Sequence, residues 1–307
     1  MHDVKKRLNG FNGAYLPTEI RSDIRLNKTA SDSDPMDIKK MFVQFWKSSN
    51  SKVSLVRDVV VALLAVFVIL MILWGYTGQW FAAPMVAIES GSMEHPHPPS
   101  GRLGTIDAGD MVLVQKVTKL SDIVPHGGPI KGAEAQNGWR SYGDYGDVII
   151  YKPLGRDDVS QIIHRAMCWV AVYHKDGVAT YTIADFGVYN ATVLTIPELG
   201  LYNSVPRPAW TQSGFLTKGD NNDIIDQMTQ ICPEPVQLNW ISGKARSEIP
   251  WLGTINLFFE DVLHGKNTVG NVHPDSLMCL GIVIAVLISI PIVLDVYDYM
   301  KKRKKAL

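Results

Sequence analysis

Residues 59–78 read VVVALLAVFVILMILWGYTG, and residues 277–294 read LMCLGIVIAVLISIPIVL. Neither stretch contains a charged residue. A helix needs about 20 apolar residues to cross the hydrocarbon core of a bilayer, whereas a helix of a soluble protein normally keeps a polar face. The two stretches therefore predict transmembrane helices at residues 57–79 and 276–296. Pro291 is expected to kink the second helix without preventing it, because membrane neighbours can satisfy the carbonyl that the proline leaves free.

The first apolar stretch is interpreted as a permanent anchor and not as a cleaved signal peptide. A signal peptide lies within about the first 15–30 residues and has an apolar core of about 7–15 residues. Here a long polar segment, residues 1–56, comes first. Trp80 and Phe81 follow the apolar stretch, and aromatic rings of this kind favour the membrane–water interface.

Basic residues flank both predicted membrane helices. Lys47, Lys52 and Arg57 precede the first helix, and the segment KKRKK at 301–305 follows the second. Basic residues near membrane helices favour the cytoplasmic side. Both termini are therefore expected in the cytoplasm, with the protein in the cell membrane. The predicted segments are a cytoplasmic tail at 1–56, an extracytoplasmic domain at 80–275 and a basic cytoplasmic tail at 297–307.

The charge composition argues against nucleic acid as the main partner. The 307-residue chain has a formal net charge of +0 and is 46% hydrophobic. Nucleic acid is not an expected partner, because binding to phosphates needs a basic surface. Cys168 and Cys232 both fall in the predicted external domain, where a disulfide is chemically feasible. Neither cysteine has a CxxC or metal-binding spacing, so the sequence does not support a zinc site.

The external domain is predicted to be mainly β. Short runs of β-branched and aromatic residues recur between turn signals, as is typical of strands. The segment HKDG at 174–177 predicts a hairpin turn. A short helix is expected in the N-terminal tail near MDIKKMFVQFWK, residues 36–47. The predicted strands are residues 85–89, 110–117, 147–152, 161–173, 177–183, 215–218 and 236–240, with loops at 95–109 and 120–146.

Ser92 lies in the sequence ESGSME, residues 89–94, directly after a predicted strand and a glycine. A serine hydroxyl is a weak nucleophile until a neighbouring base takes its proton. In a tight turn, the hydroxyl of Ser90 and the amide of Ser92 could face one developing oxyanion. SGS is also a common loop sequence, so this motif does not by itself indicate an active site.

Three further residues complete a candidate catalytic set. His164 stands in IIHR, inside a predicted strand, where a histidine is more often a packed side chain than a base. The segment TKGDNNDIID at 217–226 supplies Asp220 and Asp226. Asp220 follows a glycine, and in such a turn an aspartate can bond its own backbone. Asp226 has no evident local task, and a catalytic histidine needs a carboxylate to orient its ring.

These motifs, taken together and in this order, resemble those of type I signal peptidases. The match is to the archaeal and endoplasmic-reticulum branch, in which a histidine stands where the bacterial enzymes have a lysine base. The resemblance covers about residues 85–245 and the preceding helix. The matching segments are SGSME at 90–94, GDMVLVQKV at 109–117, YGDVIIY at 145–151, IIHR at 162–165 and TKGDNN at 217–222.

The resemblance implies a membrane-anchored serine endopeptidase on the family's twisted, mostly antiparallel β scaffold. It would remove signal peptides from exported pre-proteins after small residues, without a cofactor. Ser92 would be the nucleophile and His164 the general base. Asp226 is expected to orient His164, with Asp220 holding the loop or sharing that role. Ser90 would join the Ser92 amide in the oxyanion hole.

The substrate is expected to bind as an added β-strand. The residues expected to line its site are Met85, Val86, Ala87, Ile88, Ile162 and Ile163. The expected partners are signal peptides and the lipid membrane, with the protein-translocation channel as a further candidate. An extended chain spans at most about 3.6 Å per residue, so Ser92 should lie within roughly 50 Å of the membrane exit at Gly78.

Two features leave alternatives open. The segment HPHPP at 95–99 and a longer insertion separate SGSME from Gly109, which departs from the family pattern. His95 and His97 have no third metal ligand nearby and are predicted to lie on the surface. One alternative function is a binding or scaffold protein that keeps the fold without the chemistry. Another is a serine peptidase of the same scaffold that uses a lysine base, for which Lys218 is the candidate.

Overall fold

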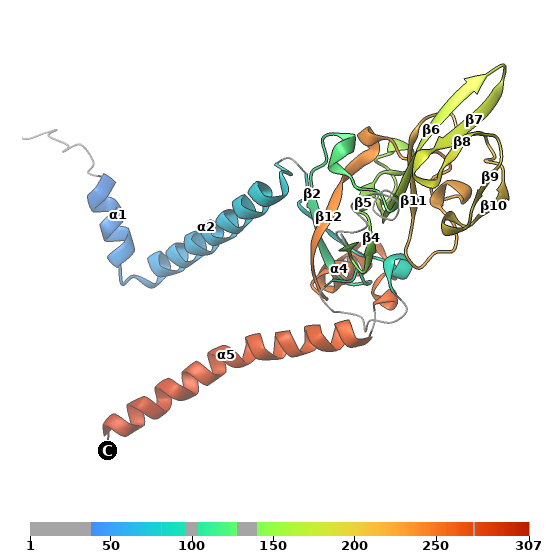
Figure 1. The fold of residues 1–307 in the computed structure, drawn as a ribbon. Helices are drawn as coiled ribbons and strands as arrows, with labels where there is room; N and C mark the ends of the chain where they lie inside the picture. The colour runs from blue at the N-terminus through green and yellow to red at the C-terminus, as the bar shows by residue number, and fades with distance from the viewer. Residues whose placement is uncertain (1–37, 81, 96–103, 128–139, 273, 307) are drawn as a thin grey trace, which may run out of the picture. The chain divides into compact units, whose positions relative to one another are not determined.

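The computed structural model describes residues 38–80, 82–95, 104–127, 140–272 and 274–306. The chain forms two compact units, residues 1–68 and 69–307. The prediction for Phe81 and much of the predicted N-terminal tail lie outside the described residues. Figure 1 shows the order of the helices and strands along the chain.

The first unit contains helix α1 (Ile38–Lys47) and most of helix α2 (Ser51–Thr77). Helix α1 confirms the short helix expected near residues 36–47. The Asn50 side chain caps α2 by accepting the Lys52 N–H at 3.0 Å. The guanidinium of Arg57 donates to the Trp46 carbonyl at 2.9 Å and so links the two helices.

Two long apolar helices are found among the described residues, one near each end of the chain. The first is α2, and the second lies within α5 (Pro274–Ala306); their most apolar 18-residue stretches have mean hydropathies of 2.8 and 3.0. No side chain in either apolar window is buried against the rest of the protein. Length and composition allow both helices to cross a membrane, as the sequence predicts.

The second unit is built on a mostly antiparallel sheet, which confirms the predicted β class. Within the described residues eight strands form one sheet in the order β1-β2-β12-β5-β6-β7-β8, and β11 also pairs with β6. Its strands are β1 (Met85–Ala87), β2 (Met111–Gln115), β5 (Val148–Tyr151), β6 (Ile162–Lys175), β7 (Val178–Ile183), β8 (Val188–Ala191), β11 (Gly214–Lys218) and β12 (Ile241–Ile249). Two small pairs are β3 (Arg140–Ser141) with β4 (Asp144–Tyr145) and β9 (Leu194–Ile196) with β10 (Leu201–Ser204).

Strand β6 is the longest of the described strands, and it pairs with three others: β5, β11 and β7. Its first residues pair with β5, and His164 stands opposite Ile149. Its middle pairs with β11, and its last residues form the hairpin with β7 that the HKDG turn predicts. Figure 1 shows this hairpin extending away from β5 and β12.

The sheet curls so that distant strands share a core. Val86 of β1 and Ile163 of β6 pack against the same cluster of buried side chains, although β2, β12 and β5 separate their strands in the sheet. The N-terminal end of β6 therefore lies close to the edge strand β1. This closure positions the candidate site.

The structure corrects several predicted elements. The segment at 236–240 is not a strand: Val236 forms an isolated bridge with Phe215, and a 3-10 turn, η10 (Leu238–Trp240), follows. The strand is β12, which begins at Ile241. Strands β8, β9 and β10 and helix α4 (Gly253–His264) were also not predicted.

The part of the second unit outside α5, called the β unit below, contains two cysteines, and they do not form a disulfide. Cys168 and Cys232 are free and fully buried, and they belong to different clusters of the hydrophobic core. Burial raises the pKa of the Cys168 thiol well above its ordinary value. Both side chains therefore act as small core residues.

Candidate active site

Ser92 lies in a tight turn that follows β1. The turn is a single 3-10 turn, η3 (Gly91–Met93), closed by the Glu94 N–H donating to the Gly91 carbonyl at 3.1 Å. Met93 is 1% exposed and anchors the turn in the core. The Ser92 side chain is half-buried and points toward the start of β6, where it meets His164.

His164 connects Ser92 to a buried carboxylate. Its Nε2 lies 2.9 Å from Ser92 Oγ, and its Nδ1 lies 2.7 Å from Asp226 Oδ2. A carboxylate accepts hydrogen bonds only, so Nδ1 carries a proton. In the neutral ring, Nε2 then has the free lone pair, and the Ser92 hydroxyl donates to it. This is the tautomer that a general base for Ser92 requires.

Asp226 is held by the hydroxyl groups of Tyr151 and Thr217, two residues that the sequence did not predict for the site. It opens the 3-10 turn η9 (Asp226–Met228) and is 0% exposed. Besides His164, its Oδ2 accepts the Tyr151 hydroxyl at 2.8 Å and the Thr217 hydroxyl at 2.7 Å. Burial and the charge of Asp226 raise the pKa of Tyr151 well above its ordinary value, so Tyr151 stays a proton donor.

The arrangement favours proton transfer from Ser92 to His164. Asp226 places a negative charge beside a ring that is 3% exposed, where solvent screens little. When the ring takes up the serine proton, it forms an imidazolium next to that carboxylate. Before the transfer, the buried charge of Asp226 faces a neutral ring. After it, the same carboxylate faces the positive ring of His164, and this pairing stabilises the imidazolium.

Asp220 does not contact His164 and belongs to a separate ion cluster. It accepts a hydrogen bond from Arg165 Nε at 2.8 Å and a second from Arg165 Nη2, and His95 Nε2 lies 2.9 Å from its Oδ2. Burial alone would raise the pKa of Asp220, but the hydrogen bonds from Arg165 and His95 prevail and lower it. The structure thus assigns Asp220 to holding the loop.

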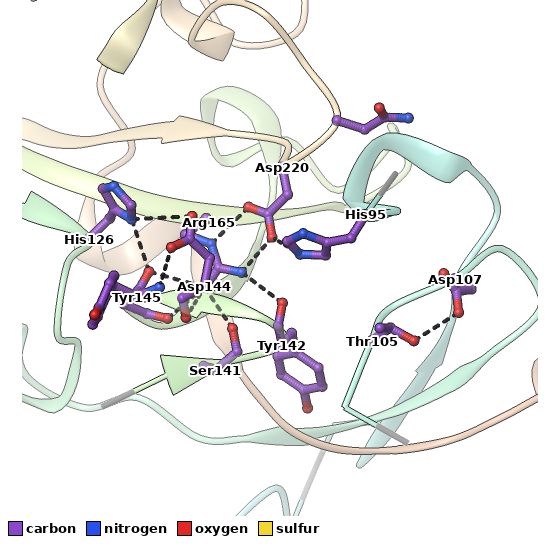
Figure 2. Close-up of polar contacts among 12 residues, drawn as sticks. His95, Thr105, Asp107, His126, Ser141, Tyr142, Asp144, Tyr145, Arg165 and Asp220 are labelled. Atoms are coloured by element: carbon purple, nitrogen blue, oxygen red, sulfur yellow. Dashed lines mark hydrogen bonds and ion pairs between the residues drawn. The ribbon is translucent and has the colours of Figure 1, made fainter. Parts of the chain in front are cut away.

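Arg165 is the centre of this cluster, as Figure 2 shows. It follows His164 on β6 and is 0% exposed. Its guanidinium also donates to five carbonyls around the β3–β4 turn, those of Ser141, Tyr142, Asp144, Tyr145 and Gly146. A buried guanidinium is tolerable only when it is paired and hydrogen-bonded, and here every side of the group has a partner.

The Asp220 loop also fixes the turn that carries Ser92, called the nucleophile turn below after the role predicted for Ser92. The Asn221 N–H donates to the Ser92 carbonyl at 2.9 Å, and the Asn221 side chain donates to the Gly91 carbonyl at 3.1 Å. A Cβ at Gly219 would lie 2.6 Å from the Ser92 carbonyl oxygen. Glycine is therefore needed for this close approach of the two backbones.

His95 does not lie free on the surface, so that prediction is wrong. It directly follows the nucleophile turn, its ring is half-buried against Gly143, and it bonds Asp220 (Figure 2). The hydrogen bond with Asp220 raises the pKa of His95 above its ordinary value. His97 lies outside the described residues, and within the described part of the chain no cluster of three metal-binding side chains occurs.

Two other residues were predicted for the site: Ser90 for the oxyanion hole and Lys218 as an alternative base. Ser90 is exposed, with its Oγ 3.4 Å from Ser92 Oγ. The N–H groups at the start of a 3-10 turn have no acceptor within the turn, and the Ser92 amide is one of them. Lys218 stands opposite Arg165 in the β11–β6 ladder. Among the described residues, the side chains that hydrogen-bond Ser92 Oγ are those of His164 and Ser90.

Strand β1 is an edge strand with one side of its backbone unused. Ile88 exchanges hydrogen bonds with the Gly109–Asp110 segment, and the Pro84 carbonyl accepts from Val114. Because backbone groups alternate along a strand, those of Met85 and Ala87 point the other way. In the described part of the chain, no hydrogen bond to these outward groups is present.

The six predicted substrate-binding residues divide between surface and core. Met85, Val86 and Ala87 are partly exposed on β1, and Ile162 and Ile163 are partly exposed at the start of β6. Ile88 is 2% exposed and belongs to the core cluster, so it could form only the floor of a pocket. The pairing of β6 with β11 ends at Arg165, which leaves one edge of β6 unpaired near His164.

No model of a known protein family matches the chain, and a search of curated proteins finds no significant match.

Proposed function

We propose that the protein is a membrane-bound serine endopeptidase of the signal peptidase type, which removes signal peptides from exported pre-proteins. The observation that carries this proposal is the hydrogen-bonded series Ser92–His164–Asp226, with distances of 2.9 Å and 2.7 Å. A nucleophile, a base and a group that orients the base are the three parts of a serine peptidase. An idle scaffold protein has no need of a fully buried carboxylate that is linked through a histidine to a half-buried serine.

The first half of the reaction forms an acyl-enzyme. Ser92 Oγ attacks the carbonyl carbon of the scissile bond, and its proton passes to His164 Nε2. The oxyanion that forms is stabilised by the Ser92 N–H and the Ser90 hydroxyl. The C–N bond then breaks as His164 gives its proton to the leaving amine, and the signal peptide remains as an ester on Ser92.

The second half releases the signal peptide. Water attacks the ester carbonyl while His164 Nε2 takes one proton from it. The ester bond breaks, and the same proton returns to Ser92 Oγ. Asp226 stays ionised throughout and steadies the imidazolium in both halves. The step requires no other reactant than water.

The open backbone edges support the mode of substrate binding. The substrate adds as a strand along the outward groups of Met85 and Ala87, near the unpaired edge of β6 at Ile163. Main-chain hydrogen bonds align the chain, and small side chains suit a site whose floor is the buried Ile88. The curled antiparallel sheet is compatible with the signal-peptidase scaffold.

The link between α2 and the sheet supports an active site close to the membrane. The Lys116 N–H donates to the Thr77 carbonyl at the end of α2, at 2.8 Å, and the Gln79 side chain donates to the Ser242 carbonyl at 2.8 Å. The two apolar helices then anchor the protein in the cell membrane, with both termini in the cytoplasm. Signal peptides emerge beside their own apolar segment, so such tethering raises the effective concentration of the bond to be cut.

The proposal is tested by reconstituting the full chain in liposomes with a pre-protein and sequencing the new N-terminus. The expected result is one cut after a small residue, with no cut by Ser92→Ala or His164→Ala. Lys218→Ala should cut normally, because Lys218 does not bond Ser92. Cleavage by Ser92→Ala would favour an idle scaffold with a contaminating peptidase, and loss of activity in Lys218→Ala alone would favour a lysine base.

A further inference from the structure

Helix α4 exposes a continuous apolar face that the catalytic proposal does not use. Its sequence is GTINLFFEDVLH, residues 253–264. Five large apolar side chains are exposed at the spacing i, i+3, i+4, i+7, i+8, which places them within an arc of about 140°. They are Ile255 (39%), Phe258 (55%), Phe259 (56%), Val262 (64%) and Leu263 (72%).

The opposite face of α4 fixes the helix to the β unit. Thr254 and Leu257 are buried, and the Thr254 N–H donates to the Gly109 carbonyl at 2.9 Å. The helix lies next to β1. Because this face is held in place, α4 cannot turn its five apolar side chains inward. An exposed apolar face of this size marks a surface that meets lipid or another protein.

The chain between α4 and α5 is short, and its described residues, 265–272, are held by hydrogen bonds. Asp261 accepts hydrogen bonds from the Thr268 and Val269 N–H groups at 2.8 and 2.9 Å, and Asn271 donates to the Glu89 carbonyl at 2.9 Å. Helix α5 begins at Pro274, so only residues 265–273 separate the two helices. This link keeps α4 within reach of any bilayer that α5 enters.

We propose that α4 lies in the membrane interface with its apolar face, from Ile255 to Leu263, in the acyl region of the lipid. An amphipathic helix of this kind binds a lipid surface without crossing it. The inference rests on the proposed membrane anchoring, and it adds a second point of contact. Lys266, just after the helix, forms ion pairs with Glu89 at 3.8 Å and Glu260 at 3.5 Å, so the apolar face alone supports the lipid contact.

This contact would set the height of the active site above the lipid. Helix α4 begins beside Gly109, which pairs with Ile88, and Asn271 holds Glu89 three residues before Ser92. The edge strand β1 and the nucleophile turn are therefore tied to the segment that lies in the interface. A substrate held in the same bilayer would meet Ser92 at a fixed depth.

The first test measures depth with a fluorophore on one added cysteine in a Cys279→Ser background, in which the remaining Cys168 and Cys232 are buried. The full chain is reconstituted in phosphatidylcholine–phosphatidylglycerol vesicles with brominated acyl chains, and quenching is compared at three sites. Labels at Phe259→Cys and at Leu287→Cys in α5 should be quenched, and a label at His264→Cys on the opposite face of α4 should not. Quenching at Leu287→Cys without quenching at Phe259→Cys overturns the inference and leaves the anchoring intact. No quenching at either site overturns both.

The second test separates the lipid contact from the chemistry. The double variant Phe258→Glu with Phe259→Glu should lower cleavage of a membrane-inserted pre-protein at least about tenfold. Cleavage of a short soluble peptide in detergent should stay unchanged, and His264→Glu should cut both substrates normally. An equal loss for both substrates, or no loss for either, contradicts the inference. Absence of activity already in the unmodified protein would instead count against the proposed function.

Discussion

One oxygen of Asp226 collects the hydrogen bonds that define the site. Its Oδ2 accepts from His164, Tyr151 and Thr217, all within 2.8 Å. Burying a carboxylate is costly unless it is hydrogen-bonded, so these donors stabilise the charge that the imidazolium needs. The two hydroxyls of Tyr151 and Thr217 position Asp226.

The charge of Asp226 is tested by Asp226→Asn, which keeps the shape of the side chain. The amide no longer fixes the proton on His164 Nδ1 and offers no charge to the imidazolium. The value of kcat/KM for a pre-protein should fall by about 10³–10⁴-fold. Asp223→Asn, at an exposed position of the same loop, is the matched control and should change nothing. A loss of less than about tenfold would show that Asp226 is not the orienting group.

The raised pKa of His95 predicts that the stability of the folded protein depends on pH. The hydrogen bond of His95 with Asp220 raises its pKa above 6.5, so the folded state binds the proton more tightly than the unfolded chain. The stabilisation is fully present below pH 6.5 and is lost as the pH rises through the raised pKa.

The variant His95→Asn should therefore lower Tm more at about pH 6 than at about pH 9, in detergent melts. His174→Asn, at the exposed end of β6, should give the same small change at both pH values. If His95→Asn lowers Tm by an equal amount at every pH, the ion cluster does not hold a protonated His95.

At the scale of the elements, the sequence predicts those strands whose own residues favour the β conformation. Strands such as β2, β5 and β6 lie close to their predicted bounds because β-branched runs form them. Strand β12 reads ISGKARSEI and has no such run. Its buried positions include the small residues Gly243 and Ala245. Glycine is needed at 243 because a Cβ there would lie 2.5 Å from the Gln115 carbonyl oxygen of β2. Its neighbours in the sheet, and not its own propensity, determine this strand.

The same limit applies to the candidate site. The sequence motifs pointed to Ser92, His164 and Asp226, which the structure brings together. Tyr151 and Thr217 could not be found, because only the register of β5, β6 and β11 brings their hydroxyls to Asp226. Helix α4 could have been found, since its apolar residues recur at helical spacing.

The edge of β1 gives a prediction about substrate binding. The Ala87 N–H points away from β2, so Ala87→Pro removes a donor from the open edge and none from the ladder. Cleavage of a pre-protein should fall at least about tenfold through a higher KM, while Tm changes little. The control is Ala87→Val, which keeps the backbone N–H that proline lacks and should therefore retain cleavage of the same pre-protein. Equal kinetics for Ala87→Pro and the unmodified protein would exclude strand addition at β1.

At the scale of the whole molecule, the site joins segments that lie far apart in the chain. Ser92 comes from the region next to α2, His164 from the middle of the sheet and Asp226 from the loop after β11. Hydrogen bonds from Lys116 and Gln79 bind the end of α2 to that sheet. The last residues of α2 are thus hydrogen-bonded to the same sheet that carries His164.

The central claim is that His164 activates the hydroxyl of Ser92, and Ser92→Cys measures this directly without knowledge of the substrate. The variant is made in a Cys279→Ser background, where Cys168 and Cys232 are buried. The pH dependence of alkylation at position 92 is compared with that of the same variant carrying His164→Ala. We expect the midpoint with His164 to lie lower by about one pH unit or more, because an imidazole stabilises the thiolate. Identical profiles with and without His164 would contradict the account.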